Sequence, residues 1–381
     1  MRVMSLNLSH YRNLCGDAFV PDAGVNILYG NNAQGKTNLL EAIWLFTGSR
    51  SFRGAKDAEL VRFGETQAAL TLRFEAQQRE QTAEITIRDA RRHATLNGVK
   101  KPAASRLAGS FCGVIFSPSH LSLVKDGPEG RRRFLDAAYC QLRPGYLPVL
   151  ADFQRALSQR NALLKEQRRI GGQETLLEIW DDRLAATGAR VILARTAYIR
   201  RLAPLAAAIY SGLSGGHEQL SVFYQPTGGI SPDAPLSELA AQLKQAFLAA
   251  RGADFAAGFT TVGPHRDDLG LHINELPART YGSQGQQRSV VLALKLAEAS
   301  VLEKVTGEKP VALLDDVMSE LDEQRQDYIL NHIHDWQVFI TCCEPSAVMR
   351  MTGGQTFHVK QGMWTNESDE RRENNAGSGT I

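Results

Sequence analysis

The chain has 381 residues, which is enough for two or three domains with a large hydrophobic core. Its 43 basic and 41 acidic side chains nearly cancel, so the net charge of +2 provides no general attraction to nucleic acid. A surface that binds DNA or RNA therefore has to come from local clusters of lysine and arginine.

The sequence has no apolar run of the roughly 18 residues that a membrane-spanning helix needs. Its first residues, MRVMSLNLSHYRN, also lack the apolar core of a signal peptide. The five cysteines form no C-x-x-C pair and have no histidine at zinc spacing. We therefore expect a cytoplasmic protein with reduced cysteines and no membrane contact.

Residues 1–125 are predicted to form a sheet-rich lobe. Several short segments alternate apolar and polar residues, as half-buried strands do. Asn97-Gly98 has the composition of a two-residue hairpin turn, which needs positive φ angles. One helix is expected in this lobe, directly after a glycine-containing loop.

That loop has the pattern G-x-x-x-x-G-K-[ST] at residues 30–37, between an apolar strand run at 25–28 and apolar residues at helical spacing over 38–47. In such a loop, backbone N–H groups and the positive end of the following helix surround phosphates. We predict that Lys36 reaches the β- and γ-phosphate oxygens of ATP and that the Thr37 hydroxyl holds Mg²⁺. The predicted ATP-binding residues are Gly30, Asn31, Asn32, Ala33, Gln34, Gly35, Lys36 and Thr37.

The central part of the chain is predicted to be mainly helical. Apolar side chains recur there at helical spacing among many charged residues, and strand patterns return only after Phe255. Gly171-Gly172 and Gly215-Gly216 indicate breaks between helices, and a further helix is predicted at 236–251.

The predicted organisation is a discontinuous α/β lobe with a helical insertion and a tail. The α/β lobe takes residues 1–125 and 256–364, and the helical lobe takes 126–255. The polar residues 365–381 are too poor in apolar side chains to pack, so a disordered tail is expected there.

Two carboxylates, Asp315 and Asp316, follow the apolar run 311–314. A phosphate loop needs a carboxylate at the end of a neighbouring strand to hold the Mg²⁺ shell. We predict that Asp315 has this role and that Asp316 polarises the attacking water. The predicted catalytic residues are then Lys36, Asp315 and Asp316, and the predicted Mg²⁺ ligands are Thr37 and Asp315. A strand that merely ends in acidic turn residues is the alternative.

About 280 positions separate Lys36 from Asp315, far more than a compact phosphate-loop domain needs between these elements. ATP-binding-cassette folds have such an insertion, and a signature loop precedes their acidic strand. The segment 282–288, GSQGQQR, stands in that position and begins an apolar-periodic helix. A serine hydroxyl at a helix N-terminus can meet a γ-phosphate, although a plain helix start is the alternative. The predicted signature residues are Ser283, Gln284, Gly285 and Gln286.

The chain resembles the RecF family of bacterial recombination and repair ATPases, which is related to SMC-type heads. The resemblance rests on the phosphate loop and on four segments: FSPSHLSLVKDGPEGRRRFLD (116–136), VGPHRDDL (262–269), GSQGQQR (282–288) and LLDDVMSELD (313–322). It implies an α/β fold of the ABC/SMC-type ATPase head, with a mixed sheet and an inserted helical lobe. It also implies that Ser319, Glu320, Leu321 and Asp322 form the D-loop at a dimer contact.

Two positions depart from the wider ATP-binding-cassette pattern. Asp316 replaces the usual glutamate, and Thr341-Cys342 stands where a switch histidine would follow the strand. Because an aspartate reaches less far than a glutamate, these departures imply slow hydrolysis.

The resemblance further implies a homodimer, since the signature loop of a cassette ATPase completes the site of a partner chain. ATP binding would close this dimer and hydrolysis would release it. DNA, both single- and double-stranded and at junctions between the two, is the implied partner. RecO and RecR are implied protein partners in loading RecA, in replication-gap maintenance and in the SOS response.

Several basic residues are candidates for contacts to DNA phosphates, although a solvated helix face is the alternative for each cluster. They are Arg50, Arg53, Lys56, Arg131, Arg132 and Arg133. Arg12 resembles an arginine that lies near the nucleotide in SMC-type proteins, and a surface salt bridge is its alternative. His265 and Arg266 could face either the γ-phosphate or the dimer seam.

Two other functions stay open at this point. One is the nucleotide-binding subunit of a membrane transporter, against which the altered signature, the missing switch histidine and the long insertion argue. The other is an ATP-gated DNA-binding switch with no useful turnover, instead of a weak DNA-stimulated ATPase. Turnover measured with and without DNA junctions would separate such a switch from a weak DNA-stimulated ATPase.

Overall fold

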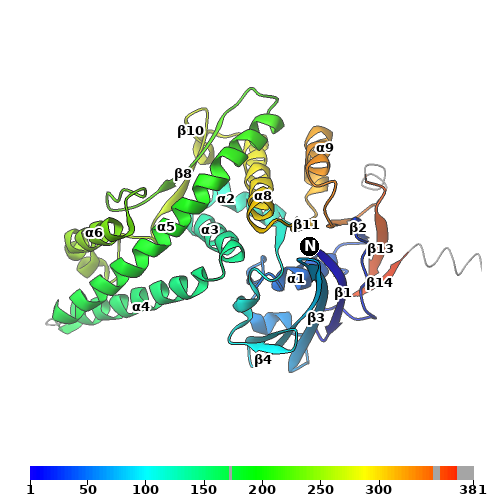
Figure 1. The fold of residues 1–381 in the computed structure, drawn as a ribbon, viewed down its shortest axis with the longest axis horizontal. Coiled ribbons are helices and arrows are strands. Elements are labelled where there is room, and N and C mark those ends of the chain that lie inside the picture. Colours follow the sequence, from blue (N-terminus) through cyan, green and yellow to red (C-terminus); the bar gives the residue numbers. More distant parts are fainter. Residues whose placement is uncertain (171–173, 346–351, 367–381) are drawn as a thin grey trace, which may run out of the picture. The chain divides into compact units, whose positions relative to one another are not determined.

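The computed structural model describes residues 1–170, 174–345 and 352–366 (Figure 1). They form two compact units. The first unit consists of Met1–His120 and the chain from Lys295 onward, and the second consists of Leu121–Leu294. Within the described ranges, none of the helices has the length and apolar character needed to cross a membrane.

The first unit is built on a six-stranded sheet of order β14-β13-β2-β12-β11-β7. Its strands are β2 (Val25–Tyr29), β7 (Gly113–Phe116), β11 (Val311–Asp315), β12 (Val338–Cys342), β13 (Gln355–Lys360) and β14 (Met363–Asn366). All neighbouring strands are parallel except β13 and β14. Strands β7, β11 and β12 are buried along their whole length, as in parallel sheets covered on both faces. Because β2, β12 and β11 are parallel neighbours, their carboxyl ends share one edge of the sheet.

A five-stranded antiparallel sheet and helix α1 (Lys36–Leu45) complete the core of the first unit. The sheet has the order β1-β3-β4-β5-β6, with β1 (Arg2–Ser9), β3 (Gln67–Ala76), β4 (Arg79–Arg88), β5 (Arg91–Leu96) and β6 (Val99–Lys101). One hydrophobic cluster contains residues of both sheets and of α1, whose positions 39–45 are all buried. The predicted hairpin turn is confirmed, since Asn97 and Gly98 join β5 to β6 with φ angles of 51° and 76°.

Shorter elements lie in the connections between or after these strands. They are η1 (Asp57–Leu60), η2 (Ala104–Leu107), η3 (Pro118–Leu121), η4 (Met318–Glu320) and α9 (Glu323–His332). Asp322 caps α9, because its side chain accepts a hydrogen bond from the backbone N–H of Arg325.

The second unit is mainly helical, as predicted. Its longer helices are α3 (Pro128–Leu142), α4 (Tyr146–Ile170), α5 (Glu174–Leu213) and α6 (Leu236–Ala257), and its short ones are α2 (Ser122–Lys125) and α7 (Ala278–Tyr281). Helix α5 packs against both α4 and α6. Helix α8 (Gln284–Thr306) begins in this unit and continues into the first.

Where the structure describes the predicted helix breaks, the helices end beside glycines. Helix α5 ends at Leu213, and Gly215 and Gly216 have φ angles of 64° and 80°. Helix α6 begins at Leu236, where the predicted helix begins, and ends before the left-handed Gly258. The break predicted at Gly171-Gly172 lies outside the described residues.

The sequence prediction missed strand β8 (Leu220–Gln225). This strand pairs antiparallel with β9 (Asp268–Ile273), which also pairs with β10 (Leu276–Pro277). The pairing ties the strands after Phe255 to the helical unit, so the predicted boundary at residue 256 is corrected to Leu294. The burial of β8 alternates, but six residues between long helices are too short a pattern to stand out.

The two outer boundaries also differ from the prediction. The first unit's N-terminal part ends at His120 instead of residue 125. At the other end, Thr365 and Asn366 belong to β14, and the rest of the predicted tail lies outside the described residues.

Candidate nucleotide-binding site

The predicted phosphate loop lies between β2 and α1, at the carboxyl edge of the six-stranded sheet. Gly30 has a φ of 142°, and a Cβ there would overlap the carbonyl oxygen of Val359. Gly35, with a φ of 116°, precedes α1, and a Cβ there would lie 2.7 Å from Leu14. Both glycines of the pattern are therefore required by the backbone of this loop.

Lys36 begins α1 and is buried, with 8% of its surface exposed. Its ammonium group donates hydrogen bonds to the carbonyl oxygens of Gly30 and, at 2.9 Å, of Asn31. The positive charge is thus held inside the loop, beside the positive end of the helix dipole. Both charges favour an anion at this position.

Thr37 and Asp315 are brought together from opposite ends of the chain. The Thr37 hydroxyl donates to Oδ1 of Asp315 at 2.7 Å, across 278 positions of sequence. Asp315 ends β11, and the Thr341 hydroxyl of the neighbouring β12 donates to the same oxygen at 3.0 Å. Burial raises the pKa of Asp315 above its ordinary value, and the adjacent Asp316 adds to the effect. A buried carboxylate of this kind is stabilised by a bound cation.

Asp316 is the next residue after β11 and takes a left-handed conformation, with a φ of 51°. Its backbone N–H donates to the Thr341 hydroxyl at 2.9 Å, which fixes the turn. The Ser319 hydroxyl donates to Oδ1 of Asp316 at 3.1 Å. Ser319 belongs to the predicted D-loop, so this hydrogen bond joins the D-loop to Asp316, the residue predicted to polarise the attacking water.

Two cysteines follow Thr341 at the end of β12. Cys342 is buried, and this burial raises the pKa of its thiol to about 11. Cys342 is therefore a neutral thiol at neutral pH, which is unsuited to the role of a switch histidine. Cys343 is exposed, and its thiol donates to Oδ1 of Asn32 in the phosphate loop at 3.3 Å. All five cysteines are free, as expected for reduced thiols.

Arg12 forms a partly buried ion pair with Glu41 of α1. Its Nε and Nη2 donate to the two carboxylate oxygens at 2.6 and 3.1 Å. Glu41 is fully buried and also accepts hydrogen bonds from the hydroxyls of Tyr11 and Ser51. Of the two roles considered for Arg12, the structure therefore contains the salt bridge, on the phosphate-loop helix itself.

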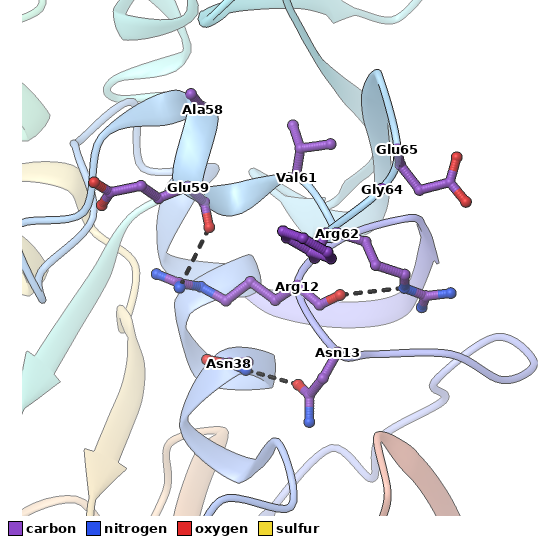
Figure 2. A pocket seen from close by; sticks show the side chains of 10 residues that line it. Arg12, Asn13, Asn38, Ala58, Glu59, Val61, Arg62, Gly64 and Glu65 are labelled. Atoms are coloured by element: carbon purple, nitrogen blue, oxygen red, sulfur yellow. Dashed lines mark hydrogen bonds between the residues drawn. The ribbon is translucent and has the colours of Figure 1, made fainter.

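A surface pocket of about 570 Å³ lies beside the phosphate loop (Figure 2). Its wall includes Arg12, Asn13 and Asn38, and Asn38 directly follows Thr37. Asn38 donates to Oδ1 of Asn13 at 2.7 Å. Phe63, which is fully exposed, lies in the same wall. The sequence analysis missed this pocket because its residues come from three separate segments, around residue 12, at Asn38 and between residues 58 and 65, with no shared motif.

The predicted signature loop lies in the second unit, where Ser283 precedes α8. The Ser283 hydroxyl accepts from the backbone N–H of Gln286 at 3.2 Å, and the Gln286 side chain accepts from the N–H of Ser283 at 2.7 Å. This reciprocal pair is a capping box. Ser283 and Gln284 are exposed, so the N-terminus of a 23-residue helix is open to solvent.

The basic triplet 131–133 does not form one DNA-binding cluster, which corrects the prediction for Arg131. That side chain is buried and donates to both carboxylate oxygens of Asp268, at 2.6 and 2.8 Å. Arg132 is half-buried and donates to the carbonyl oxygen of Asp267, whereas Arg133 is exposed. The three predicted DNA-binding residues of the first unit are exposed. They are Arg50, Arg53 and Lys56.

The segment 262–269 packs mainly within its own unit. His265 Nε2 lies 2.9 Å from the carbonyl oxygen of Thr260, and burial lowers the pKa of this histidine to about 4. Arg266 is exposed, and its guanidinium lies 4.8 Å from the centre of the Phe259 ring. The structure thus contains a neutral His265 that is mostly packed inward, and Arg266 is the more exposed of the two side chains.

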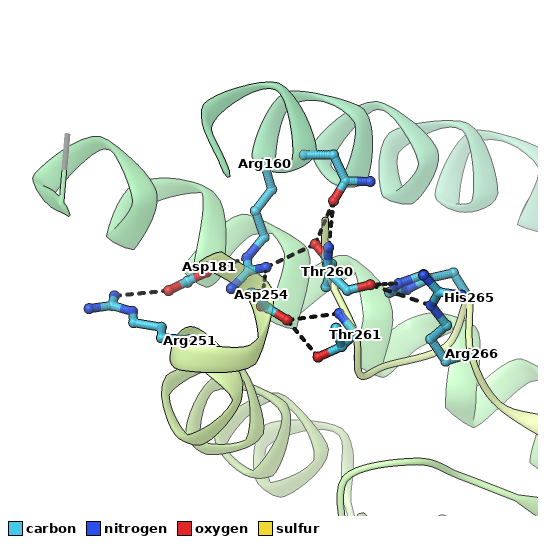
Figure 3. Close-up of polar contacts among 9 residues, drawn as sticks. Arg160, Asp181, Arg251, Asp254, Thr260, Thr261, His265 and Arg266 are labelled. Carbon is cyan, nitrogen blue, oxygen red and sulfur yellow. Dashed lines mark hydrogen bonds and ion pairs between the residues drawn. The ribbon is translucent and has the colours of Figure 1, made fainter. Parts of the chain in front are cut away.

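A buried ion network holds Thr260 and Thr261, which lead into this segment, against helices α4, α5 and α6 (Figure 3). Arg160 of α4 is fully buried and pairs with Asp181 of α5 and Asp254 of α6, each at 2.6 Å. It also donates to the Thr260 hydroxyl at 2.9 Å. Asp254 in turn accepts from the backbone N–H and the hydroxyl of Thr261. One arginine therefore joins two other helices and the segment that leads to His265.

Residues 2–365 match the family model for the RecF/RecN/SMC N-terminal domain, and the chain belongs to this family. Its relatives include proteins named DNA replication and repair protein RecF. The protein from Rippkaea orientalis is 42% identical over 90% of this chain and 93% of its own length. The protein from Acetivibrio thermocellus is 35% identical over 94% and 98%. The resemblance to RecF is thereby confirmed, and the transporter-subunit alternative is set aside.

Solved structures agree with this assignment. A structure of the recombination mediator protein RecF with ATP, in the RecFOR pathway, superposes with a TM-score of 0.89 and 37% identity, covering 96% of this chain and 97% of that one. An Smc head domain from Pyrococcus furiosus superposes with a TM-score of 0.54 at 14% identity, covering 99% of this chain and 100% of that one. The predicted fold class, an ABC/SMC-type ATPase head with a helical insertion, is confirmed.

Proposed function

We propose that this chain is an ATP-dependent DNA-binding protein of DNA replication and recombinational repair, in which ATP binding closes a homodimer on DNA. The observation that carries the proposal is the 2.7 Å hydrogen bond from Thr37 to Asp315, because it joins the phosphate loop to a strand-end carboxylate. The relatives named for DNA replication and repair support the role, and the RecF–ATP structure supports ATP as the nucleotide.

In this proposal, Lys36 binds the β- and γ-phosphate oxygens, and Thr37 and Asp315 hold Mg²⁺. A hydroxyl and a carboxylate are oxygen donors of the kind that Mg²⁺ takes. When bound, Mg²⁺ neutralises charge on the β- and γ-phosphates. The hydroxyl of Thr341 keeps Asp315 in place from the neighbouring strand, so the metal-binding carboxylate is positioned in advance.

Asp316 is proposed to orient the attacking water for slow hydrolysis. Its carboxylate is already engaged by a hydrogen bond from the Ser319 hydroxyl, and an aspartate reaches less far than a glutamate. A non-catalytic switch remains the second candidate for the same reason. Single-turnover ATP hydrolysis, measured with and without DNA junctions, decides between a slow ATPase and a non-catalytic switch. The rate of the Asp316→Asn variant gives the background hydrolysis, because the amide keeps the size of the side chain but cannot accept a proton.

The signature residues Ser283 to Gln286 are proposed to complete the ATP site of a second copy. Ser283 is exposed at a helix N-terminus, a position that favours a phosphate. Ser283→Asp is the sharpest test, since aspartate also caps helices but brings a negative charge to the γ-phosphate. Light scattering should detect ATP-dependent dimers of the wild type and none of this variant.

Ser283→Asn is the matched control, because asparagine caps the helix without a charge. Dimers of Ser283→Asp that form with ATP as readily as those of Ser283→Asn would contradict the shared site. The D-loop residues, Ser319 to Asp322, are proposed to lie at the same dimer contact.

Further partners follow from the relatives' role in the RecFOR pathway. We propose RecO and RecR as protein partners and a cytoplasmic role in RecA loading, replication-gap maintenance and the SOS response. Pull-down of purified RecR by this chain with and without ATP would test the first of these contacts. No binding in either state would contradict it.

A further inference from the structure

The turn between β13 and β14, formed by Gln361 and Gly362, lies against the phosphate loop. Both residues have left-handed backbone conformations, with φ angles of 51° and 81°, as a two-residue hairpin turn requires. The backbone N–H of Gln361 donates to Oε1 of Gln34 at 2.7 Å. The backbone N–H of Gly362 donates to the carbonyl oxygen of Gln34 at 2.9 Å. Two successive backbone donors of the turn therefore bind one residue of the loop.

Residues 13–15 fix the same turn in place. The backbone N–H of Cys15 donates to the carbonyl oxygen of Gly362 at 2.8 Å, and the side-chain amide of Asn13 donates to the carbonyl oxygen of Gln34 at 3.3 Å. A Cβ on Gly362 would overlap the carbonyl oxygen of Asn13, so this close approach requires glycine. The turn, residues 13–15 and Gln34 are thus joined in one hydrogen-bonded cluster.

The hairpin of β13 and β14 also contacts the first glycine of the loop. A Cβ on Gly30 would overlap the carbonyl oxygen of Val359 in β13. The hairpin is itself anchored in the core, because Phe19 packs against Phe357 of β13 and Trp364 of β14, with ring centres 4.9 and 5.7 Å apart. An anchored hairpin therefore contacts the phosphate loop at its start as well as near its end.

The loop needs such support because its backbone is strained at Ala33. This residue has a φ of 63°, in the left-handed region that is unfavourable for a residue with a Cβ. Ala33 is exposed, as are Asn31 and Asn32, so burial does not hold the conformation. Strained backbone persists where the surrounding contacts fix it. Gln34 directly follows Ala33, and its hydrogen bonds to the turn supply such contacts.

We propose that the turn of Gln361 and Gly362 is a clamp that holds the phosphate loop in its anion-binding conformation before ATP binds. Gln34 is the positioning residue through which the clamp acts. The inference rests on the proposed function and deepens it, because it assigns part of the ATP affinity to the β13–β14 hairpin. A loop that is already ordered binds phosphate more tightly, since it loses less conformational entropy on binding.

The Gln34 side chain acts through the loop backbone and not by touching ATP, because both of its polar atoms are engaged. Oε1 accepts from the turn, and Nε2 donates to the carbonyl oxygen of Asn32 at 3.4 Å. The first test variant is Gln34→Met, which keeps the length of the side chain but removes the acceptor. Gln361 is exposed, so water replaces the lost acceptor and the thermal unfolding temperature should not change. ATP affinity by isothermal titration should fall about fivefold, the equivalent of about one hydrogen bond.

The second test variant is Gly362→Ala, whose new Cβ meets the Asn13 carbonyl oxygen and displaces the turn from the loop. Its matched control is Gly98→Ala, in the hairpin turn between β5 and β6 of the same unit. Gly98 has a similar φ of 76°, but among the described residues no atom lies within 4 Å of a Cβ placed there. Both variants should lose stability through backbone strain. Only Gly362→Ala should also lose ATP affinity, by at least about fivefold.

The double variant Gln34→Met/Gly362→Ala distinguishes one clamp from two unrelated losses. If both changes act through the same contact, the double variant should bind ATP no more weakly than the weaker-binding single variant. Additive losses would overturn the clamp, and so would an equal loss of affinity in Gly98→Ala. Unchanged affinity of Gln34→Met would overturn it even if Gly362→Ala fails to fold. A wild type that does not bind ATP would overturn the proposed function itself.

Discussion

Removing Asp254 should destabilise the helical unit far more than an ordinary ion-pair deletion. Asp254→Ala leaves the fully buried Arg160 with one carboxylate, Asp181, which is already shared with Arg251. It also removes the acceptor of two hydrogen bonds from Thr261. An uncompensated charge in a protein interior costs about 3–5 kcal/mol, and the lost hydrogen bonds place the expected loss in the upper half of that range.

The control is the pair Arg200–Asp233, which has the same nitrogen–oxygen distance of 2.6 Å in the same unit. Its side chains are 62% and 71% exposed, so Asp233→Ala should cost no more than about 1 kcal/mol. Urea unfolding followed by circular dichroism compares the two variants under one protocol. Equal losses, or a loss below about 1 kcal/mol for Asp254→Ala, would refute the reasoning that burial and not distance sets the energy.

Three further predictions concern single side chains. Lys36→Ala should lower ATP affinity by about 3 kcal/mol, or about 100-fold, by isothermal titration, because two charge-assisted contacts to phosphate are lost; unchanged affinity would contradict the site. Asp315→Asn should stabilise the nucleotide-free protein at pH 7, because burial raises the pKa of this carboxyl and its ionised form costs stability above the pKa of the unfolded chain, about 4. The gain should vanish by about pH 3, and thermal unfolding at both pH values checks it. Arg131→Ala should cost about 3 kcal/mol by leaving the half-buried Asp268 unpaired, whereas Arg133→Ala should be silent in the same unfolding assay.

The parts of the fold that the sequence predicted best are those fixed by local chemistry. Gly30 and Gly35 have backbone conformations that other residues avoid, and Asn97-Gly98 does the same for a hairpin. Strand β8 was missed because its pairing partners lie 43 to 53 residues further along the chain (Gln225 with Asp268, Leu220 with Ile273) and its own pattern is short. Tertiary pairing, not local preference, made it a strand.

The contact partners of individual side chains were harder to predict from the sequence than the phosphate loop. Arg131, Arg132 and Arg133 are identical in type and adjacent in sequence, yet one is buried against Asp268 and one is exposed. A helix turns 100° per residue, so neighbours face different surroundings, and a run of like charges hides that difference. The pocket lined by Asn38 was likewise not predicted, because three segments far apart in sequence build it together, residues 12–13, Asn38 and residues between 58 and 65.

The order of strands in the six-stranded sheet has a consequence for biosynthesis. Of the six strands, β2, which precedes the phosphate loop, leaves the ribosome first, but its neighbours in the sheet are β12 and β13, which are made some 300 residues later. At about 5–20 residues per second, about 300 residues of further synthesis take roughly 15–60 s. For that interval both edges of an apolar strand are unpaired, and Asp315 does not yet exist to meet Thr37. The nascent chain therefore cannot use ATP to stabilise its fold, and it has the greatest need of a chaperone before its last strands are made.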